Sequence, residues 1–144
     1  MPYPPLVVLA GEAEYRDKFL ADYCASGGLC TFDGVPVAFR PWHFSHAFYQ
    51  AAGRVPGDKS LFSRERAERM EWINTALCDR AAKLFFGYDK ERKAIDRSRR
   101  VSVSNGNYVV VIQFEKSGRA AVFVTAFCAT PETLKKIESA PVWK

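Results

Sequence analysis

Both histidines of the chain, His43 and His46, fall within the short run His43-Phe44-Ser45-His46. Histidine is the side chain best suited to take up and release a proton near neutral pH, so this run can supply general acid or base chemistry. The run is rich in aromatic residues, and a packed, hydrogen-bonded histidine is the alternative for each of the two. We take His46 as the stronger candidate for a catalytic role.

A zinc site is the second chemistry that these histidines could join. The order Cys24-x5-Cys30-x12-His43-x2-His46 offers two sulfur and two nitrogen ligands, as in a zinc finger. Both the gap between the cysteines and the gap between the histidines differ from the usual spacings of about two to four and three to five residues. We therefore expect no metal and no other cofactor, and we expect the cysteines to be reduced thiols.

Arginines cluster where the clearest helix of the sequence is expected to begin. The run Ser63-Arg64-Glu65-Arg66 places two of them in the first turn, and Arg69 follows one turn later. The positive end of the helix dipole disfavours cations there by up to about 1 kcal/mol, and a bound phosphate would remove this mismatch. The alternative, favoured for Arg64 taken alone, is surface ion pairs with the glutamates of the same helix: Glu65, Glu68 and Glu71.

Thr125 is a hydroxyl in an apolar strand. Alternation predicts that it shares one face with Phe123 and Phe127. A threonine in a strand usually reflects β-propensity alone, so contact with substrate is the less common outcome. Cys78 and Cys128 are expected to be small buried residues, since no flanking histidine and acid mark a cysteine nucleophile. Phosphate loops, paired carboxylates and Ser-His-Asp signatures are absent from the sequence, which disfavours ATPases and dehydrogenases.

Positive charge is concentrated in residues 83–100. The chain has a net charge of +5 and an isoelectric point near 9.1, and this segment alone holds seven basic and three acidic side chains. Such a segment either grips the phosphates of a nucleic acid or is a solvated loop, and we weigh the two equally. The residues expected to bind substrate, by ion pairing or by stacking on bases, are Tyr49, Arg64, Tyr88, Arg92, Lys93 and Arg99.

These residues must be positioned by helices and strands that the sequence also predicts. Capping signals and helical spacing of apolar residues predict helices over 12–23, 63–79 and 131–139. Asp33-Gly34 predicts a hairpin over 31–37, in which Pro36 should restrict the second strand to an edge of the sheet. Residues 53–59 should form an exposed loop. Turn signals at Gly106 and Gly118 separate further strands, expected over 83–88, 99–104, 107–115 and 119–129.

This order of elements predicts an α+β domain with helices packed on a three- to four-stranded antiparallel sheet and a short C-terminal helix. A chain of 144 residues, of which 48% are hydrophobic, is expected to form a single domain. Its apolar runs are too short to cross a bilayer, so we expect no membrane partner. No basic, apolar leader is visible at the N-terminus, so we expect a cytoplasmic protein.

Five blocks of the chain suggest a family. They are His43-x2-His46-Ala47-Phe48-Tyr49, Phe62-Ser63-x-Glu65-Arg66-Ala67-x-Arg69-x2-Trp72-Ile73, Arg99-Arg100-Val101, Tyr108-Val109-Val110-Val111-Ile112 and Phe123-Val124-Thr125-Ala126-Phe127. Together they resemble phage-associated nuclease-like domains of the barnase/EndoU/colicin/RelE (BECR) assembly. The resemblance implies a nuclease-like core over 43–139, preceded by the helix and hairpin of 1–42.

The resemblance also implies a function and a site. Many members are metal-independent ribonucleases, often toxins of phages or mobile elements that cut RNA or transfer RNA and are held in check by an antitoxin or immunity protein. Carried over by position, the catalytic residues are His46, Arg66, Arg69, Arg100 and Thr125. The histidine would act as acid or base, the arginines would stabilise the phosphorane transition state, and the threonine would orient a phosphate oxygen.

Two other functions fit the same residues. A non-catalytic module could bind nucleic acid or a protein through the basic surface without cleaving anything. A prophage accessory domain, whose charge serves only solubility, is the third hypothesis. Loss of RNA cleavage in a His46→Ala variant separates the enzyme from both.

Overall fold

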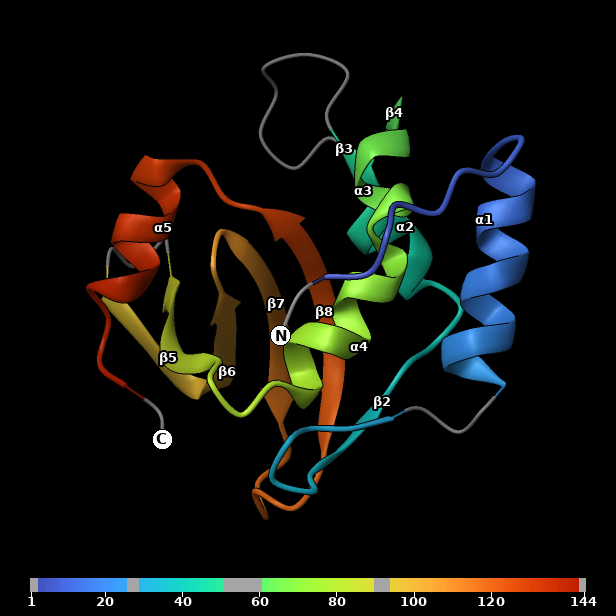
Figure 1. Cartoon of the computed structure of the whole chain (residues 1–144). Helices are drawn as coiled ribbons and strands as arrows, with labels where there is room; N and C mark the ends of the chain where they lie inside the picture. Colours follow the sequence, from blue (N-terminus) through green and yellow to red (C-terminus); the bar gives the residue numbers. More distant parts are fainter. Residues whose placement is uncertain (1–2, 26–28, 51–60, 90–93, 143–144) are drawn as a thin grey trace.

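The computed structural model describes residues 3–25, 29–50, 61–89 and 94–142, and in these residues the chain has an α+β fold (Figure 1). The helices are α1 (Glu12–Phe19), α2 (His43–Phe48), α3 (Arg64–Glu68), α4 (Met70–Cys78) and α5 (Pro131–Glu138), and a π-helical turn, η1 (Leu20–Cys24), continues α1. The strands are β1 (Leu29–Cys30), β2 (Pro36–Ala38), β3 (Tyr49–Gln50), β4 (Leu61–Phe62), β5 (Lys83–Asp89), β6 (Ala94–Asn105), β7 (Tyr108–Phe114) and β8 (Ala121–Cys128). The loop expected over 53–59 lies outside the described residues.

The expected antiparallel meander is confirmed and forms β5 to β8. Its last two turns contain Gly106 and Gly118, whose φ angles of 65° and 71° lie in the left-handed region that favours glycine. The strand β6 is longer than expected, because it already begins at Ala94. The expected C-terminal helix is also confirmed: the Thr130 hydroxyl accepts a hydrogen bond from the Thr133 amide at 3.2 Å and caps α5.

The sheet is larger than the three or four antiparallel strands that were expected. Six strands follow the order β1-β2-β8-β7-β6-β5, and the added strand β2 runs parallel to β8. The prediction that Pro36 confines its strand to an edge is therefore wrong. Pro36 is the first residue of β2 and pairs with Cys30, while pairing with β8 begins only at Val37, so the missing proline amide removes no bond from that ladder.

Aromatic residues join the N-terminal helix to the sheet. Tyr15, Phe19 and Tyr23 are buried on one face of α1 and η1, as their spacing predicts. The Phe19 ring lies 5.7 Å from that of Phe48 and 6.4 Å from that of Phe123 on β8. Helices α1 to α4 thus gather on one side of the sheet, whereas α5 lies beside β5 (Figure 1).

The helix expected over 63–79 is interrupted at Arg69, which separates α3 from α4 and has φ −98° and ψ 17°. In a continuous helix the Trp72 amide would bond the Glu68 carbonyl. That carbonyl instead accepts a hydrogen bond from the Val7 amide at 2.9 Å, and the Trp72 amide turns to the Arg69 carbonyl, also at 2.9 Å. The break is therefore caused by a segment more than sixty residues away in the sequence.

That segment, residues 3–10, is the N-terminal strap. Tyr3 stacks on Trp72 with ring centroids 4.3 Å apart, and its hydroxyl donates to the Asn105 carbonyl at 2.6 Å. The Trp72 indole donates in turn to the Pro4 carbonyl at 2.9 Å. The strap thereby ties α4 to the end of β6. No helix among the described residues is long and apolar enough to cross a membrane.

Candidate active site

The two histidines of α2 have different surroundings. His43 is 5% exposed, its Nδ1 accepts a hydrogen bond from the Arg40 amide at 2.8 Å, and its ring meets that of Phe123 edge-on at 5.7 Å. Burial lowers the pKa of His43 to about 4, with a smaller contribution from the nearby charges of His46 and Arg40. His43 is thus the packed, neutral histidine that was the alternative, whereas His46 is exposed to solvent.

His46 lines a depression of about 480 Å³, which we call the His46 pocket. Helix α2 supplies one wall, and the strands β7 and β8 supply the other. Its lining residues are Trp42, His43, His46, Gln113, Phe114, Glu115, Val122, Phe123 and Val124. Arg100 on β6 lies opposite Gln113 in the ladder, so the two side chains project to the same side of the sheet, but Arg100 itself does not line the pocket.

Thr125 connects α2 to β8. Its hydroxyl donates to the His46 carbonyl at 3.3 Å. The prediction that Thr125 shares a face with Phe123 is wrong, because a β-bulge interrupts the alternation of β8. Phe123 pairs with Ile112 and Thr125 pairs with the next residue, Val111, so Val124 has no partner in the ladder. Phe123 therefore lies in the core, whereas the half-buried Thr125 faces the backbone of α2.

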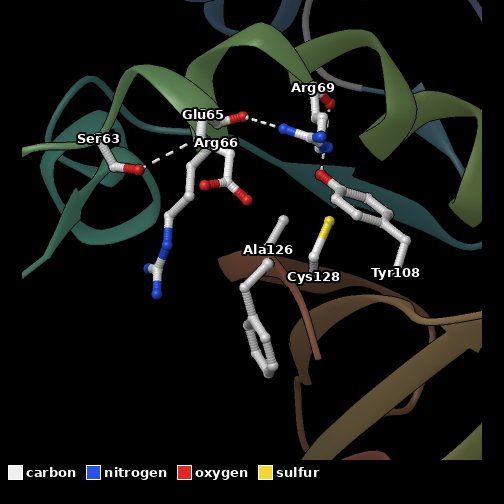
Figure 2. A pocket seen from close by; sticks show the side chains of 8 residues that line it. Ser63, Glu65, Arg66, Arg69, Tyr108, Ala126 and Cys128 are labelled. Atoms are coloured by element: carbon white, nitrogen blue, oxygen red, sulfur yellow. Dashed lines mark hydrogen bonds between the residues drawn. The ribbon is translucent and has the colours of Figure 1, made fainter. Parts of the chain in front are cut away.

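Arg66 and Arg69 both line a second, smaller pocket of about 180 Å³, called the arginine pocket (Figure 2). The carboxylate of Glu65 points into the space between α3 and β8, and the Arg66 side chain extends from the same helix, away from Arg69. Ser63 caps α3 by accepting from the Arg66 amide at 3.3 Å. The lining residues are Ser63, Glu65, Arg66, Arg69, Tyr108, Ala126, Phe127 and Cys128.

Arg69 is held from three sides. Its Nη1 donates to the Glu65 carbonyl at 2.7 Å, its guanidinium lies 5.2 Å from the centre of the Trp72 ring, and its own carbonyl accepts from the Tyr108 hydroxyl at 3.4 Å. The Nε atom of Arg69 is buried, and among the described residues none accepts a hydrogen bond from it. Such an unpaired donor is costly unless a ligand satisfies it.

Arg64 lies apart from this pocket. Its guanidinium donates to the backbone carbonyls of Leu9 and Ala10, lies 3.7 Å from the Glu68 carboxylate and covers the Tyr15 ring. The ion-pair alternative therefore fits Arg64 better than phosphate binding does, because its donors hold the N-terminal strap.

Tyr49 also has a structural partner. Its hydroxyl donates to the Glu12 carboxylate at 2.6 Å, which together with burial raises the pKa of Tyr49. It lines neither pocket. Tyr88 and Arg99 lie in β5 and β6, and Arg92 and Lys93 fall outside the described residues.

The candidate residues are thus divided between two pockets that share one strand. Val124 lines the His46 pocket, Ala126 to Cys128 line the arginine pocket, and Thr125 lies between them. The three steps along an extended strand from Val124 to Phe127 span about 10 Å. Thr125 lies on β8, and the pockets lined by His46, Arg66 and Arg69 adjoin the part of β8 from Val124 to Cys128. Arg100 lies on β6, two strands away from β8 in the sheet.

Glu65 and Trp42 also line the pockets. The sequence predicts Glu65 only as a surface partner of arginines, although its place between Arg64 and Arg66 in the first turn of a helix is a visible signal. Trp42 belongs to an aromatic cluster whose rings could either stack on bases or lie in the core, and in the structure it is exposed.

The cysteines are free thiols, and their surroundings differ in part from those expected. Cys78 is exposed rather than buried, since it ends α4, and its thiol contacts the Cys30 carbonyl at 3.4 Å. Burial raises the pKa of Cys128, which keeps that thiol protonated in the arginine pocket. The described residues contain no cluster of three or more histidine, cysteine, aspartate or glutamate side chains that could hold a metal ion.

Comparisons of the chain with models of protein families, with curated proteins and with solved structures found no match.

Proposed function

We propose that this protein is a metal-independent ribonuclease that holds RNA along the half of β8 from Val124 to Cys128. The observation that carries the proposal is that this one stretch of strand adjoins both an exposed histidine and a pair of arginines with a carboxylate. Acid, base and phosphate-binding groups are the set that cleavage of RNA without metal requires.

The arginine pocket suits a phosphate group. Its volume of about 180 Å³ is small, and Arg66 and Arg69 both border it. Guanidinium groups donate hydrogen bonds to phosphate oxygens, and a hydrogen bond between two charged groups is stronger than one between neutral groups. A bound phosphate would therefore accept from these arginines and neutralise their positive charge.

The reaction would follow from these positions. Glu65 would take the proton of the ribose 2′-hydroxyl, whose oxygen attacks phosphorus. The bond from phosphorus to the 5′-oxygen then breaks, and protonated His46 gives that oxygen its proton, leaving a 2′,3′-cyclic phosphate and a free 5′-hydroxyl. Arg66 and Arg69 would stabilise the charge of the phosphorane, Arg100 would hold a flanking phosphate, and Thr125 would keep α2 at the right distance from the strand.

The biological setting is part of the proposal. On the resemblance to toxin ribonucleases, we propose an antitoxin or immunity protein as a partner and the cytoplasm as the place of action. The fold proposed on this basis is the BECR-like core of residues 43–139, to which the strands β1 and β2 are added.

A non-catalytic nucleic-acid module is the second candidate. It is favoured by one observation, namely that His46 does not line the arginine pocket. In that case the arginines would bind phosphates, and no proton transfer would occur.

The test is incubation of purified wild-type and His46→Ala proteins with total RNA and end-labelled transfer RNA in EDTA, followed by a denaturing gel. Ser45→Ala, one position earlier on α2, is the matched control. We expect discrete cleavage by wild type and Ser45→Ala and none by His46→Ala, with salt-dependent RNA binding retained in all three. Intact RNA with all three proteins would overturn the ribonuclease, and retained binding would then support the module.

A further inference from the structure

The break between α3 and α4 changes which group bonds the Glu65 carbonyl. In a continuous helix this carbonyl would accept from the Arg69 amide, four residues further along. The Arg69 amide bonds the Arg66 carbonyl at 3.2 Å instead, so the Glu65 carbonyl is released from the helix ladder. The Arg69 guanidinium takes the released acceptor, with its Nη1 at 2.7 Å (Figure 2). The break thus supplies the hydrogen bond that fixes the Arg69 side chain at the arginine pocket.

The second support of the Arg69 guanidinium is the Trp72 ring, whose centre lies 5.2 Å away. The N-terminal strap holds this ring by two contacts. Tyr3 stacks on it with centroids 4.3 Å apart, and the Pro4 carbonyl accepts from its indole nitrogen at 2.9 Å. The stack and the hydrogen bond together fix the plane and the edge of the indole. The position of the ring under Arg69 therefore depends on the strap.

The strap also sets the break itself, although much of it faces solvent. The Val7 amide occupies the Glu68 carbonyl at 2.9 Å, which is the acceptor that the Trp72 amide would use in a continuous helix. On either side of Val7, the side chains of Leu6 and Val8 are 42% and 71% exposed. Segments that bury few apolar side chains open locally more readily than the core does. Docking of the strap is thus an equilibrium that a ligand at the arginine pocket can shift.

We propose that the N-terminal strap is the positioning element of Arg69, and that docking of the strap and binding of phosphate in the arginine pocket stabilise each other. Val7 and Trp72 are positioning residues, since neither lines the pocket and both act through Arg69. When the strap is released, the Glu68 carbonyl returns to the Trp72 amide and the helix straightens. The Arg69 amide then takes the Glu65 carbonyl, and the guanidinium loses both of its supports.

The inference rests on the proposed function, because the phosphate would be one of the RNA backbone held along β8. Binding free energies are coupled reciprocally. The docked strap therefore raises the affinity for phosphate by the same factor by which phosphate stabilises the docked strap. Couplings of this kind typically change an affinity about 5- to 150-fold.

The first test compares the affinity for inorganic phosphate, measured by calorimetry, among variants of the full chain. Val7→Pro removes the amide that occupies the Glu68 carbonyl and should weaken phosphate binding about 5- to 150-fold. Val8→Pro is the matched control and should bind phosphate as wild type does. The Val7 and Leu9 amides both donate towards the helices, so the amide between them, that of Val8, points away in an extended segment.

A double variant separates positioning from a merely structural role. In an Arg69→Ala background the strap has no guanidinium to position, so adding Val7→Pro should change the phosphate affinity by less than about twofold. A loss of equal size in both backgrounds would overturn the proposal. An unchanged affinity in Val7→Pro alone would also overturn it.

A third measurement needs no variant, so it decides the question even if Val7→Pro does not fold. In wild type, saturating inorganic phosphate should slow hydrogen exchange of the Val7 amide about 5- to 150-fold, as followed by NMR. Sodium chloride at equal ionic strength is the control and should leave the rate unchanged. An exchange rate at Val7 that phosphate does not change would overturn the coupling.

The outcomes also separate this proposal from the ribonuclease. If Val7→Pro weakens phosphate binding but wild type leaves RNA intact, the ribonuclease is overturned and the positioning of Arg69 by the strap is supported. If wild type and Val7→Pro cleave RNA equally well, the positioning is overturned and the ribonuclease is supported.

Discussion

The burial of His43 makes the stability of the fold depend on pH in a specific window. In the unfolded chain this histidine binds a proton near its ordinary pKa of about 6.5, whereas in the folded protein its pKa is about 4. Between these values the unfolded state binds more protons, so the free energy of unfolding falls as the pH is lowered from 6.5 to 4. Above and below this window the contribution of His43 is constant.

The size of the effect follows from the two pKa values. A difference of about 2.5 units at about 1.36 kcal/mol per unit gives about 3 kcal/mol of stability lost across the window. A urea dependence of about 1–3 kcal/mol per molar converts this loss to a fall of about 1–3 M in the midpoint of unfolding. Such a change is large compared with the roughly 5–15 kcal/mol that typically stabilises a whole domain.

The assay is urea unfolding, followed by circular dichroism, at several pH values between 7 and 4. The matched variant is His43→Asn, whose side-chain oxygen can accept the hydrogen bond from the Arg40 amide in place of Nδ1 but does not titrate. Carboxylates contribute equally to both proteins, so the difference between the two pH curves isolates His43. Wild type should lose about 3 kcal/mol more than His43→Asn, and parallel curves would refute the reasoning.

Three further changes test the site and its support. Thr125→Val removes the hydrogen bond to the His46 carbonyl at nearly constant shape and should slow RNA cleavage about fivefold, with Thr125→Ser restoring the rate in the same initial-rate assay. Arg66→Ala should weaken RNA binding and reduce the slope of log affinity against log salt concentration by about one, as measured by filter binding. The control is Arg119→Ala, which removes an exposed arginine, and an equal change in this variant would contradict a specific role of Arg66. Ser63→Ala removes the cap of α3 and should lower the free energy of unfolding, measured with urea, by about 1 kcal/mol. A change near zero would show that the cap does not stabilise the fold.

The elements that the sequence predicts well are those with local signals. Interactions between residues close in sequence produce the caps at Ser63 and Thr130, the buried stripe of α1 and the glycine turns of the meander. Partners far along the chain produce the interruption at Arg69, the parallel pairing of β2 and the bulge at Val124. No local pattern encodes them.

The site divides in the same way. Arg66 and Arg69 were expected in the site from the resemblance, and both line one pocket. The separation of His46 from them could not be predicted, because it depends on where α2 packs against β8. The sequence marks Glu65 by its place between two arginines, but only the position of β8 shows that this side of α3 faces a pocket.

The N-terminal strap has a consequence for synthesis of the protein. Tyr3 leaves the ribosome 102 residues before Asn105, the residue that accepts its hydrogen bond. The strap can contact Arg64, Glu68 and Trp72 once α3 and α4 have been made, but the Tyr3 hydroxyl has no acceptor until the end of β6 follows. The arginine pocket also needs Ala126 to Cys128 of β8, so it is completed late in translation.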